Sequence, residues 1–360
     1  MKSGFPPLFR AAEPVTLPWC LVRGKSRSVA LFVAVNIVSL VCLIWALRGV
    51  NFRQLFYDIA HLGWWWVSFA ALTNILLYYI QAWRWSLVLA PVTRVPVLQS
   101  SRAIFVGLYA NEVLPLRSGE IIRCYLLARW SEIPMSVALA SALIERIFDG
   151  LWLITALFFT LERVHLPPII RDAGFFLALL VAVCAVLLGI AMFWRERTLD
   201  RIANARWLSW AHVLIKDLHL IGHSRFLYYA FFLSLPFLVL QVIPIYAVMQ
   251  AFHSLRQLPL IDSFAITVIL RLNSVVPQAP GNIGTFQWAT IRGLLLFGVR
   301  KNVAQRFSFI LWGILTLPMV VVGFIAVALT GMKIGQLHIE AHGSVNPPAS
   351  VAEGDPAIRS

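Results

Sequence analysis

Apolar segments of membrane-spanning length follow one another along most of the chain. Five of them are residues 28–47, 63–85, 173–194, 226–252 and 307–332. A helix that crosses the hydrocarbon core of a bilayer needs about 20 apolar residues. Charged residues make up only 13% of the 360 positions, against about 25% in soluble domains. The sequence therefore predicts an all-α polytopic membrane protein, and it leaves no room for a large soluble enzyme domain.

The basic residues, which give a formal net charge of +14, lie in short segments between the apolar runs. In a soluble protein this charge would indicate a nucleic-acid partner. Here it fits topology signals and contact with anionic lipid headgroups, so no nucleic-acid partner is expected. Residues 1–28 and the basic segment 195–225 are placed in the cytoplasm, the latter as an interfacial helix. Residues 29–332 form the membrane domain, and residues 333–360 form a disordered cytoplasmic tail.

The four cysteines and eight histidines are scattered along the chain. Their spacing is typical neither of a metal site nor of a disulfide framework. The sequence also contains no Walker A motif. We therefore expect no metal, no cofactor, no catalytic residue and no ATP hydrolysis by the chain itself.

The positions of the loops constrain how residues 98–116 meet the membrane. With the N-terminus inside, the second span returns the chain to the cytoplasm near residues 84–94, and the loop 195–225 is cytoplasmic as well. The spans 173–194 and 135–161 then run inward and outward, so both ends of 98–116 lie on the cytoplasmic side. We expect this segment to enter the membrane and turn back, which is allowed where protein or trapped water satisfies its backbone.

An internal repeat links two interrupted apolar segments. Residues 101–121 read SRAIFVGLYANEVLPLRSGEI, and residues 263–283 read SFAITVILRLNSVVPQAPGNI. Ten of the 21 aligned positions are identical without a gap, including Asn-x-x-x-Pro-x-x-x-Gly at the same spacing. Chance similarity between two membrane helices is the alternative, but it accounts for apolar matches better than for polar and helix-breaking ones. We interpret the pair as a duplicated unit of broken helix, turn and long helix.

The two units span about 98–161 and 260–332, and the second enters from the outer side because it follows the span 226–252. Inverted repeats with broken helices that meet at mid-membrane are typical of secondary transporters. The expected fold is therefore about six spanning helices plus two re-entrant hairpins in an inverted repeat. Four basic residues would then lie near the outer face, against the positive-inside rule, namely Arg292, Arg300, Lys301 and Arg306. Two full crossings in place of the second hairpin would put some of them inside.

Prolines mark both helix breaks. Proline removes a backbone donor and clashes with the preceding turn, so Pro115 and Pro277 should end their helices. Free amide groups at a helix N-terminus inside the membrane form a ready anion site. The backbone at the breaks is expected to be shaped by the other glycines and prolines there, namely Gly119, Pro280, Gly281 and Gly284.

Charged residues surround the first break and the helix after it. Glu145 and Asp149 are four residues apart on one helical face, where like charges repel. Each charge costs at least about 2.5–3.5 kcal/mol at the centre of a spanning helix unless it is paired or wet. Arg117, Arg123 and Arg271 are the expected partners. These charges either form a closed salt-bridge cluster that holds the hairpins together, or line a polar cavity for a lipid headgroup, which we favour.

The candidate headgroup-binding residues are charged or amide side chains at the two breaks. Arginine suits phosphate because its guanidinium binds two oxygens at once, and a carboxylate would meet a cationic headgroup or a coupling proton. The residues are Asn111, Arg117, Glu120, Arg123, Glu145, Arg146, Asp149, Arg271, Asn273 and Asn282.

The second span, residues 63–85, carries both polar and aromatic signals. Asn74 and Gln81 lie seven residues apart and share a helical face, which is expected to look into the protein. Trp83, Arg84 and Trp85 at its end are interpreted as an aromatic belt at the membrane interface.

The motifs at the breaks resemble the flippase-like transmembrane domain of lysylphosphatidylglycerol synthases. They read Asn111-Glu-Val-Leu-Pro115-Leu-Arg117-Ser-Gly119-Glu120-Ile-Ile-Arg123, Glu145-Arg146-x-x-Asp149 and Pro277-x-x-Pro280-Gly281-x-x-Gly284. Together and in this order they are fairly specific, and the resemblance covers about residues 30–332. It implies a lipid-translocase fold in a bacterial inner membrane, in a stand-alone member without the soluble synthase domain.

The sequence departs from this family at one position. The family usually has an acidic residue shortly after the last Gly-x-x-Gly, where this chain has Gln287, which joins the candidate headgroup-binding residues. If that carboxylate binds a cationic headgroup in relatives, a lysyl lipid is less expected here. A neutral, glycosylated or terpenoid lipid is then favoured.

Two functions follow from these observations. The leading hypothesis is a non-enzymatic translocase that moves a phospholipid, glycolipid or other lipid intermediate between leaflets. The alternative is an intramembrane enzyme or an accessory subunit of a lipid-modification pathway, in which Glu120, Glu145 and Asp149 act as acid or base. The expected partners are membrane lipids, anionic or lipid-linked, while a homo-oligomer and a lipid-synthesis enzyme partner are left open.

Overall fold

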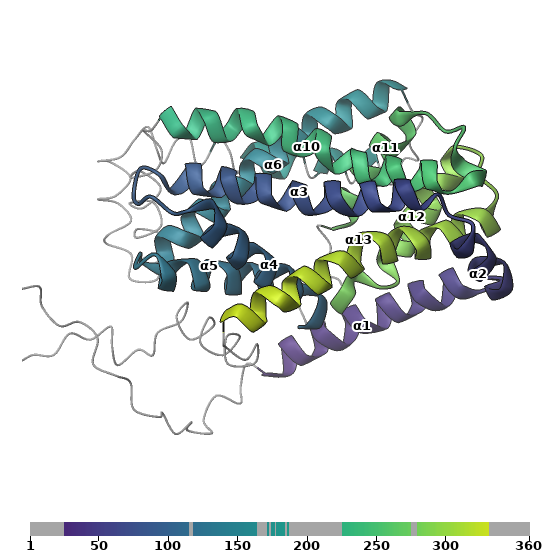
Figure 1. Ribbon diagram of the computed structural model, residues 1–360, viewed down its shortest axis with the longest axis horizontal. Helices are drawn as coiled ribbons and strands as arrows, with labels where there is room; N and C mark the ends of the chain where they lie inside the picture. Colours follow the sequence, from purple (N-terminus) through teal and green to yellow (C-terminus); the bar gives the residue numbers. More distant parts are fainter. Residues whose placement is uncertain are drawn as a thin grey trace, which may run out of the picture.

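The computed structural model describes most of the membrane domain. The described residues are 25–114, 118–163, 171–172, 174–176, 178–183, 186, 225–274 and 279–330. All secondary structure in this part of the chain is helical, which confirms the all-α fold class, and Figure 1 shows the helices packed into one elongated bundle. The predictions for segments 1–24, 195–224 and 331–360, and those for Pro115, Arg117 and Pro277, fall outside the described residues.

The described helices fall into a long and a short class. The long helices are α1 (Lys25–Leu47), α3 (Trp64–Leu89), α6 (Met135–Arg163), α10 (Arg225–Ala251) and α13 (Lys301–Thr330). The shorter ones are α2 (Phe52–Ala60), α4 (Val97–Val113), α5 (Gly119–Trp130), α11 (Leu260–Asn273) and α12 (Thr285–Leu296), with single turns η3 (His253–Leu255) and η4 (Pro280–Asn282).

Two helices within the described residues are long and apolar enough to cross a membrane, α10 and α13. A third span is counted if α1 and α2, which are bent by 82° at a short break, are taken together. α6 is equally long, but Glu145, Arg146 and Asp149 interrupt its apolar sequence. The chain is thus a helical membrane protein with candidate spans, and the total of six spans stays a prediction.

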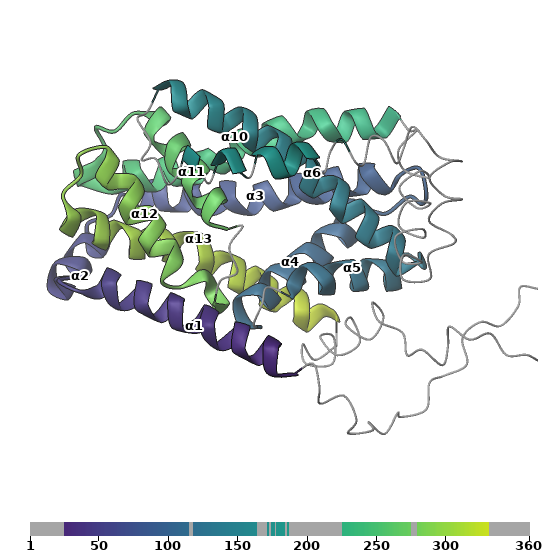
Figure 2. The ribbon, with the colours of Figure 1, turned by 180° about the vertical axis from the view of Figure 1, so that it is seen from behind.

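Two pairs of short helices enter the bundle from opposite ends. α4 packs against α5, and α11 packs against α12. Figures 1 and 2 show α4 and α5 toward one end of the long axis and α11 and α12 toward the other. As the sequence predicts, α4 ends at Val113 and α11 ends at Asn273, shortly before Pro115 and Pro277.

The helix packing follows one pattern twice. α3 packs on α4, α4 on α5 and α5 on α6, while α10 packs on α11, α11 on α12 and α12 on α13. The two sets interlock reciprocally, because α4 packs on α13 and α11 packs on α6. α3 and α10, the first helix of each set, pack side by side (Figure 1). Each of these contacts has a counterpart when α3 exchanges with α10, α4 with α11, α5 with α12 and α6 with α13.

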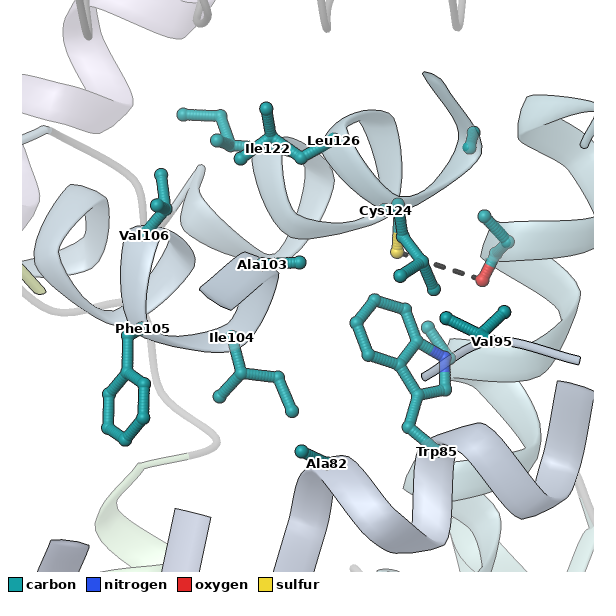
Figure 3. Packing of buried hydrophobic residues seen from close by; sticks show 14 of the residues in the cluster. Ala82, Trp85, Val95, Ala103, Ile104, Phe105, Val106, Ile122, Cys124 and Leu126 are labelled. Carbon is teal, nitrogen blue, oxygen red and sulfur yellow. Dashed lines mark hydrogen bonds between the residues drawn. The ribbon is translucent and has the colours of Figure 1, made fainter. Parts of the chain in front are cut away.

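Buried apolar residues fix the first hairpin against α3. Figure 3 shows Trp85 of α3 pointing toward Cys124 of α5, in a cluster that includes Ile104 of α4. Trp85 is fully buried, and its indole Nε1 donates to Ser141 Oγ of α6 at 2.8 Å. The interpretation of Trp85 as part of an interfacial belt is therefore wrong, because its ring fills the space between helices, whereas Trp83 is half exposed.

Glycines allow the two arms of the first hairpin to approach closely. A Cβ added to Gly119 would overlap the carbonyl oxygen of Gly107. Asn111 Oδ1 accepts a hydrogen bond from the backbone N–H of Gly119 at 2.9 Å. The side chain at the end of α4 thus satisfies a free N–H at the start of α5, and the charged first turn of α5 is held at the centre of the bundle.

Basic residues at the α2 end of the bundle have partners within the protein. Arg306 Nε of α13 donates to Asp58 Oδ2 of α2 at 2.5 Å. The charged groups of Arg292 and Lys301 lie 5.4 and 5.3 Å from the ring centroid of Trp45, within the range of cation–π contacts. These contacts offset part of the positive charge at this end, and the side of the membrane that it faces stays a prediction.

Candidate functional site

Three charged side chains form a layer that is closed from solvent, which we call the inner layer. Arg84 Nη2 of α3 lies 3.3 Å from Glu145 Oε1 of α6, and Arg123 Nη1 of α5 lies 3.2 Å from Glu145 Oε2. The side chains of Arg84 and Glu145 are 0% exposed, and that of Arg123 is 3% exposed. The inner layer therefore joins α3, α5 and α6 at one buried point.

Aromatic rings and a hydroxyl add further contacts to the arginines of the inner layer. The guanidinium of Arg84 lies 4.5 Å from the ring centroid of Phe237, and that of Arg123 lies 4.7 Å from the ring of Trp85. Arg84 Nη1 also donates to Ser234 Oγ of α10 at 3.0 Å. A charge buried in a membrane protein is costly unless it is paired and hydrogen-bonded. The inner layer is thus a closed salt-bridge cluster with a structural role.

Three other charged residues form a group that is open, which we call the open rim: Glu120, Arg146 and Asp149. Glu120 Oε1 of α5 lies 3.0 Å from Arg146 Nη2 of α6, and their side chains are 46% and 45% exposed. Asp149 Oδ1 lies 2.5 Å from Arg84 Nη1, and its side chain is 23% exposed. Arg123 connects the two groups, since its Nη2 lies 2.9 Å from Glu120 Oε2.

Three hollows meet at Arg271 of α11. The first, of about 170 Å³, is lined by Arg146 and Asp149 together with apolar residues of α6 and α10. The second, of about 200 Å³, lies between α3, α10, α11 and α13. The third, of about 90 Å³, contains Glu120 and Arg123. Arg271 lines all three, and we refer to the three hollows together as the central chamber.

The second hollow is lined by more amide side chains than charged ones, unlike the first and third hollows. Its amide side chains are those of Asn74, Gln241, Asn273 and Asn282, and one carboxylate, Glu112, also lines it. Asn74 is occupied, because its Nδ2 donates to the carbonyl of Leu315 in α13 at 2.9 Å. Polar but uncharged groups therefore lie next to the cationic Arg271.

The backbone of the second break is shaped by glycines. Gly281 and Gly284 have φ of +71° and +94°, a region that favours glycine. A Cβ on Gly284 would overlap the carbonyl oxygen of Ser39 in α1. The carbonyl of Gly281 accepts from Trp312 Nε1 of α13 at 2.8 Å. The turn is thus held between α1 and α13.

Gln287 has a local role at this turn. Its Oε1 accepts a hydrogen bond from the backbone N–H of Gly284 at 2.7 Å, and its side chain is buried. Gln287 therefore satisfies a backbone N–H at the start of α12. It lines none of the three hollows described above.

The structure brings most of the sequence-predicted residues together around the central chamber. Those that line it are Asn111, Gly119, Glu120, Arg123, Arg146, Asp149, Arg271, Asn273 and Asn282. Glu145 lies behind them in the inner layer, and its expected pairing with Arg123 is confirmed. Arg117, the other partner expected beside the first break, falls outside the described residues.

Arg84 is the residue that the sequence interpretation missed. The flanking tryptophans place it in an interfacial belt, which is wrong, because Arg84 is fully buried and contacts both Glu145 and Asp149. The sequence does contain a signal for this position. Arg84 follows Gln81 by three residues, so it continues the face of Asn74 and Gln81, and the burial of both amides confirms that this face looks inward.

The groups of the central chamber suit a ligand with polar and ionic parts. Arginine guanidinium groups bind phosphate oxygens, carboxylates bind cations, and amides bind neutral polar groups. Within the described ranges, no group of three or more His, Cys, Asp or Glu side chains has an arrangement that would hold a metal ion.

A comparison with known proteins agrees with the motifs. The family model described as "Lysylphosphatidylglycerol synthase TM region" matches residues 29–323. The matched region includes every described residue of the inner layer, the open rim and the central chamber. A search of curated proteins and a search of solved structures found no match.

Proposed function

Since this chain belongs to the family of the lysylphosphatidylglycerol synthase TM region, we propose that it is a lipid translocase. It moves a phospholipid, glycolipid or other phosphate-bearing lipid intermediate from one leaflet to the other. The headgroup passes through the central chamber, while the acyl chains stay in the surrounding bilayer. The observation that carries this proposal is the convergence of three hollows on Arg271, beside the open rim.

The exposure of the open rim supports a ligand. Charges in a spanning helix cost at least about 2.5–3.5 kcal/mol each unless they are paired or wet. The charges of the inner layer meet this requirement because they are paired with one another inside the protein. The side chains of Glu120 and Arg146 are instead nearly half exposed. A headgroup supplies the further contacts, with its phosphate on the guanidinium groups of Arg146 and Arg271. Asp149 and Glu120 then meet a cationic part of the headgroup or a coupling proton.

We further propose that α4–α5 and α11–α12 are re-entrant hairpins of an inverted repeat with about six spans. The shared Asn-x-x-x-Pro-x-x-x-Gly spacing supports this, as does the exchangeable packing of the two helix sets. α4 of the first hairpin also packs against η4 in the turn of the second. Their tips then meet near the midplane, where inverted-repeat transporters hold their substrates.

The proposal assigns no catalytic residue, metal or cofactor. It places the protein in a bacterial inner membrane with both termini in the cytoplasm. If the protein were instead an intramembrane enzyme or an accessory subunit, its loss would change the chemical composition of the lipids. Loss of a translocase changes only their sidedness. Total lipid analysis of a deletion strain, paired with leaflet-specific labelling, separates the two functions.

Reconstitution into vesicles tests the translocase directly. The purified protein is placed in vesicles with a phospholipid labelled on an acyl chain, and a membrane-impermeant quencher reports the label that reaches the outer leaflet. We expect Arg271→Gln to slow this movement about tenfold or more, because it removes the cation that all three hollows share. A wild-type rate in this variant would overturn the site, and no movement of any lipid by the wild-type protein would overturn the translocase.

The matched control for this experiment is Arg129→Gln. Arg129 is an exposed arginine of α5 that lines none of the three hollows. The Arg129→Gln substitution removes the same charge from the protein but no charge from the central chamber. Its rate should equal that of the wild type, so a loss in Arg271→Gln alone reports on the chamber.

A further inference from the structure

Gln241 of α10 is a buried amide in the central chamber whose oxygen has no hydrogen-bond partner among the described residues. Its side chain is 8% exposed. It lines both the first and the second hollow, together with Arg271 and Ser274. The amide therefore lies where the charged part of the chamber meets the part lined by amides.

Leaving this amide unpaired is costly for the folded protein. A buried polar group without a partner costs about 1–3 kcal/mol, and the neighbouring residues of α10 are almost all apolar. Another buried glutamine, Gln305, also has an unpaired Oε1, but its amide nitrogen joins two helices. Gln305 Nε2 of α13 donates to the carbonyls of Ala46 and Arg48 at 2.9 Å each. Gln241 makes no comparable bond to a described residue, so its role is not to join helices.

The unpaired atom determines which kind of ligand group fits at this point. An amide oxygen accepts hydrogen bonds and does not donate them. Gln241 Oε1 therefore calls for a ligand that donates a hydrogen bond.

Arg271 indicates the chemistry of the other part of the ligand, a phosphate. It is the cation common to both hollows that Gln241 lines, and a guanidinium binds phosphate oxygens in pairs. A ligand held at both points carries a phosphate and, beyond it, an arm with an N–H or O–H group. A choline arm has no such donor, whereas an ethanolamine arm has an ammonium and a glycerol arm has hydroxyls.

We propose that Gln241 selects the transported lipid by accepting a hydrogen bond from the arm of its headgroup beyond the phosphate. This inference rests on the proposed translocase and names its substrate class, phospholipids with a donor-bearing headgroup. It assigns Arg271 to the phosphate and Gln241 to the arm. The residue thereby determines specificity, and it takes no part in a chemical step.

Transport of three lipids with the same acyl-chain label tests this assignment. The probes are phosphatidylethanolamine, phosphatidylglycerol and phosphatidylcholine in otherwise identical vesicles. The wild-type protein should move the first two about tenfold or more faster than the third, because only they satisfy the buried acceptor. In Gln241→Leu this preference should fall to about one to one. The ratio of the first two rates reports whether an ammonium or a hydroxyl is the better donor.

Two controls separate recognition from folding. Thr267→Val removes a hydroxyl that lines the second hollow but is already bonded to the carbonyl of Ser263 at 2.7 Å, so this variant should keep the wild-type preference. Gln241→Leu should unfold at the wild-type temperature or above it, since it removes an unpaired amide. An unchanged headgroup preference in Gln241→Leu, or equal transport of all three lipids by the wild type, would overturn the inference and leave the translocase standing. Failure of the wild type to move any lipid would overturn both.

Discussion

The inner layer and the open rim contain the same kinds of residue but meet their surroundings differently. Both combine arginines with carboxylates at the centre of an apolar bundle. The side chains of the inner layer are 0–3% exposed, whereas those of the open rim are 23–46% exposed and border the central chamber. The inner layer is paired and almost fully buried within the protein, while the open rim has surface left for a ligand.

One turn of α6 divides the two groups. Glu145 belongs to the inner layer, and Arg146 and Asp149 belong to the open rim, although all three stand within five positions of the sequence. Helical geometry turns neighbouring side chains to different faces, so a single motif supplies both a structural contact and a ligand-facing group. A charged side chain inside the membrane can therefore bind a ligand only where part of its surface stays accessible.

Arg84→Met should have the largest effect on stability. The substitution removes the partner of Glu145 and Asp149 and leaves carboxylate charge buried in the bundle. Removing one partner of a buried ion pair costs about 3–5 kcal/mol. We expect the free energy of unfolding, measured by denaturant titration in detergent micelles, to fall by that amount. A wild-type unfolding free energy would show that the inner layer is not structural, and Arg129→Gln is the control with no expected loss.

Arg123→Lys should have an intermediate effect, because Arg123 belongs to the inner layer and also contacts the open rim. Its guanidinium reaches Glu145 with one nitrogen and Glu120 with another, a geometry that a single ammonium does not reproduce. Losing one hydrogen bond between charged groups costs about 1.5–3 kcal/mol. The same titration should place this variant between Arg84→Met and the wild type. A loss equal to that of Arg84→Met would mean that the two groups act as one.

Arg146→Gln should have the smallest effect on stability. Its ion pair with Glu120 is nearly half exposed on both sides, and exposed pairs contribute only about 0.2–1 kcal/mol. The unfolding free energy should therefore fall by no more than that range. A loss of the size expected for Arg84→Met would place Arg146 in the structural group and remove the distinction between the inner layer and the open rim.

The sequence predicts the elements that depend on local chemistry. Apolar length and helix-breaking residues place α3, α6, α10 and both broken segments to within a few residues. The spacing of Glu145 and Asp149, and the cost of burying their charge, correctly predict arginine partners. These features are visible because periodicity and proline act within a few turns of one helix.

Features that depend on packing between distant helices are harder to predict. Trp83 and Trp85 on either side of Arg84 look like an interfacial belt, and only the packing of α3 against α5 and α6 shows that Arg84 and Trp85 are buried. Gln241 has no motif around it, since its importance comes from an unpaired oxygen at the meeting of two hollows. By sequence, Gln287 stands where the resemblance leads one to expect an acidic headgroup-binding residue. The structure shows instead that its side chain caps the backbone N–H of Gly284.

The most direct test of this account is the rate of lipid movement by Arg146→Gln. Arg146 lines the first and third hollows, yet its ion pair contributes little to the fold. The measurement uses vesicles with acyl-labelled phosphatidylethanolamine and equal amounts of folded protein. We expect a rate about tenfold or more below that of the wild type, at nearly unchanged stability. A variant that moves the lipid at the wild-type rate would contradict the claim that the open rim serves the headgroup.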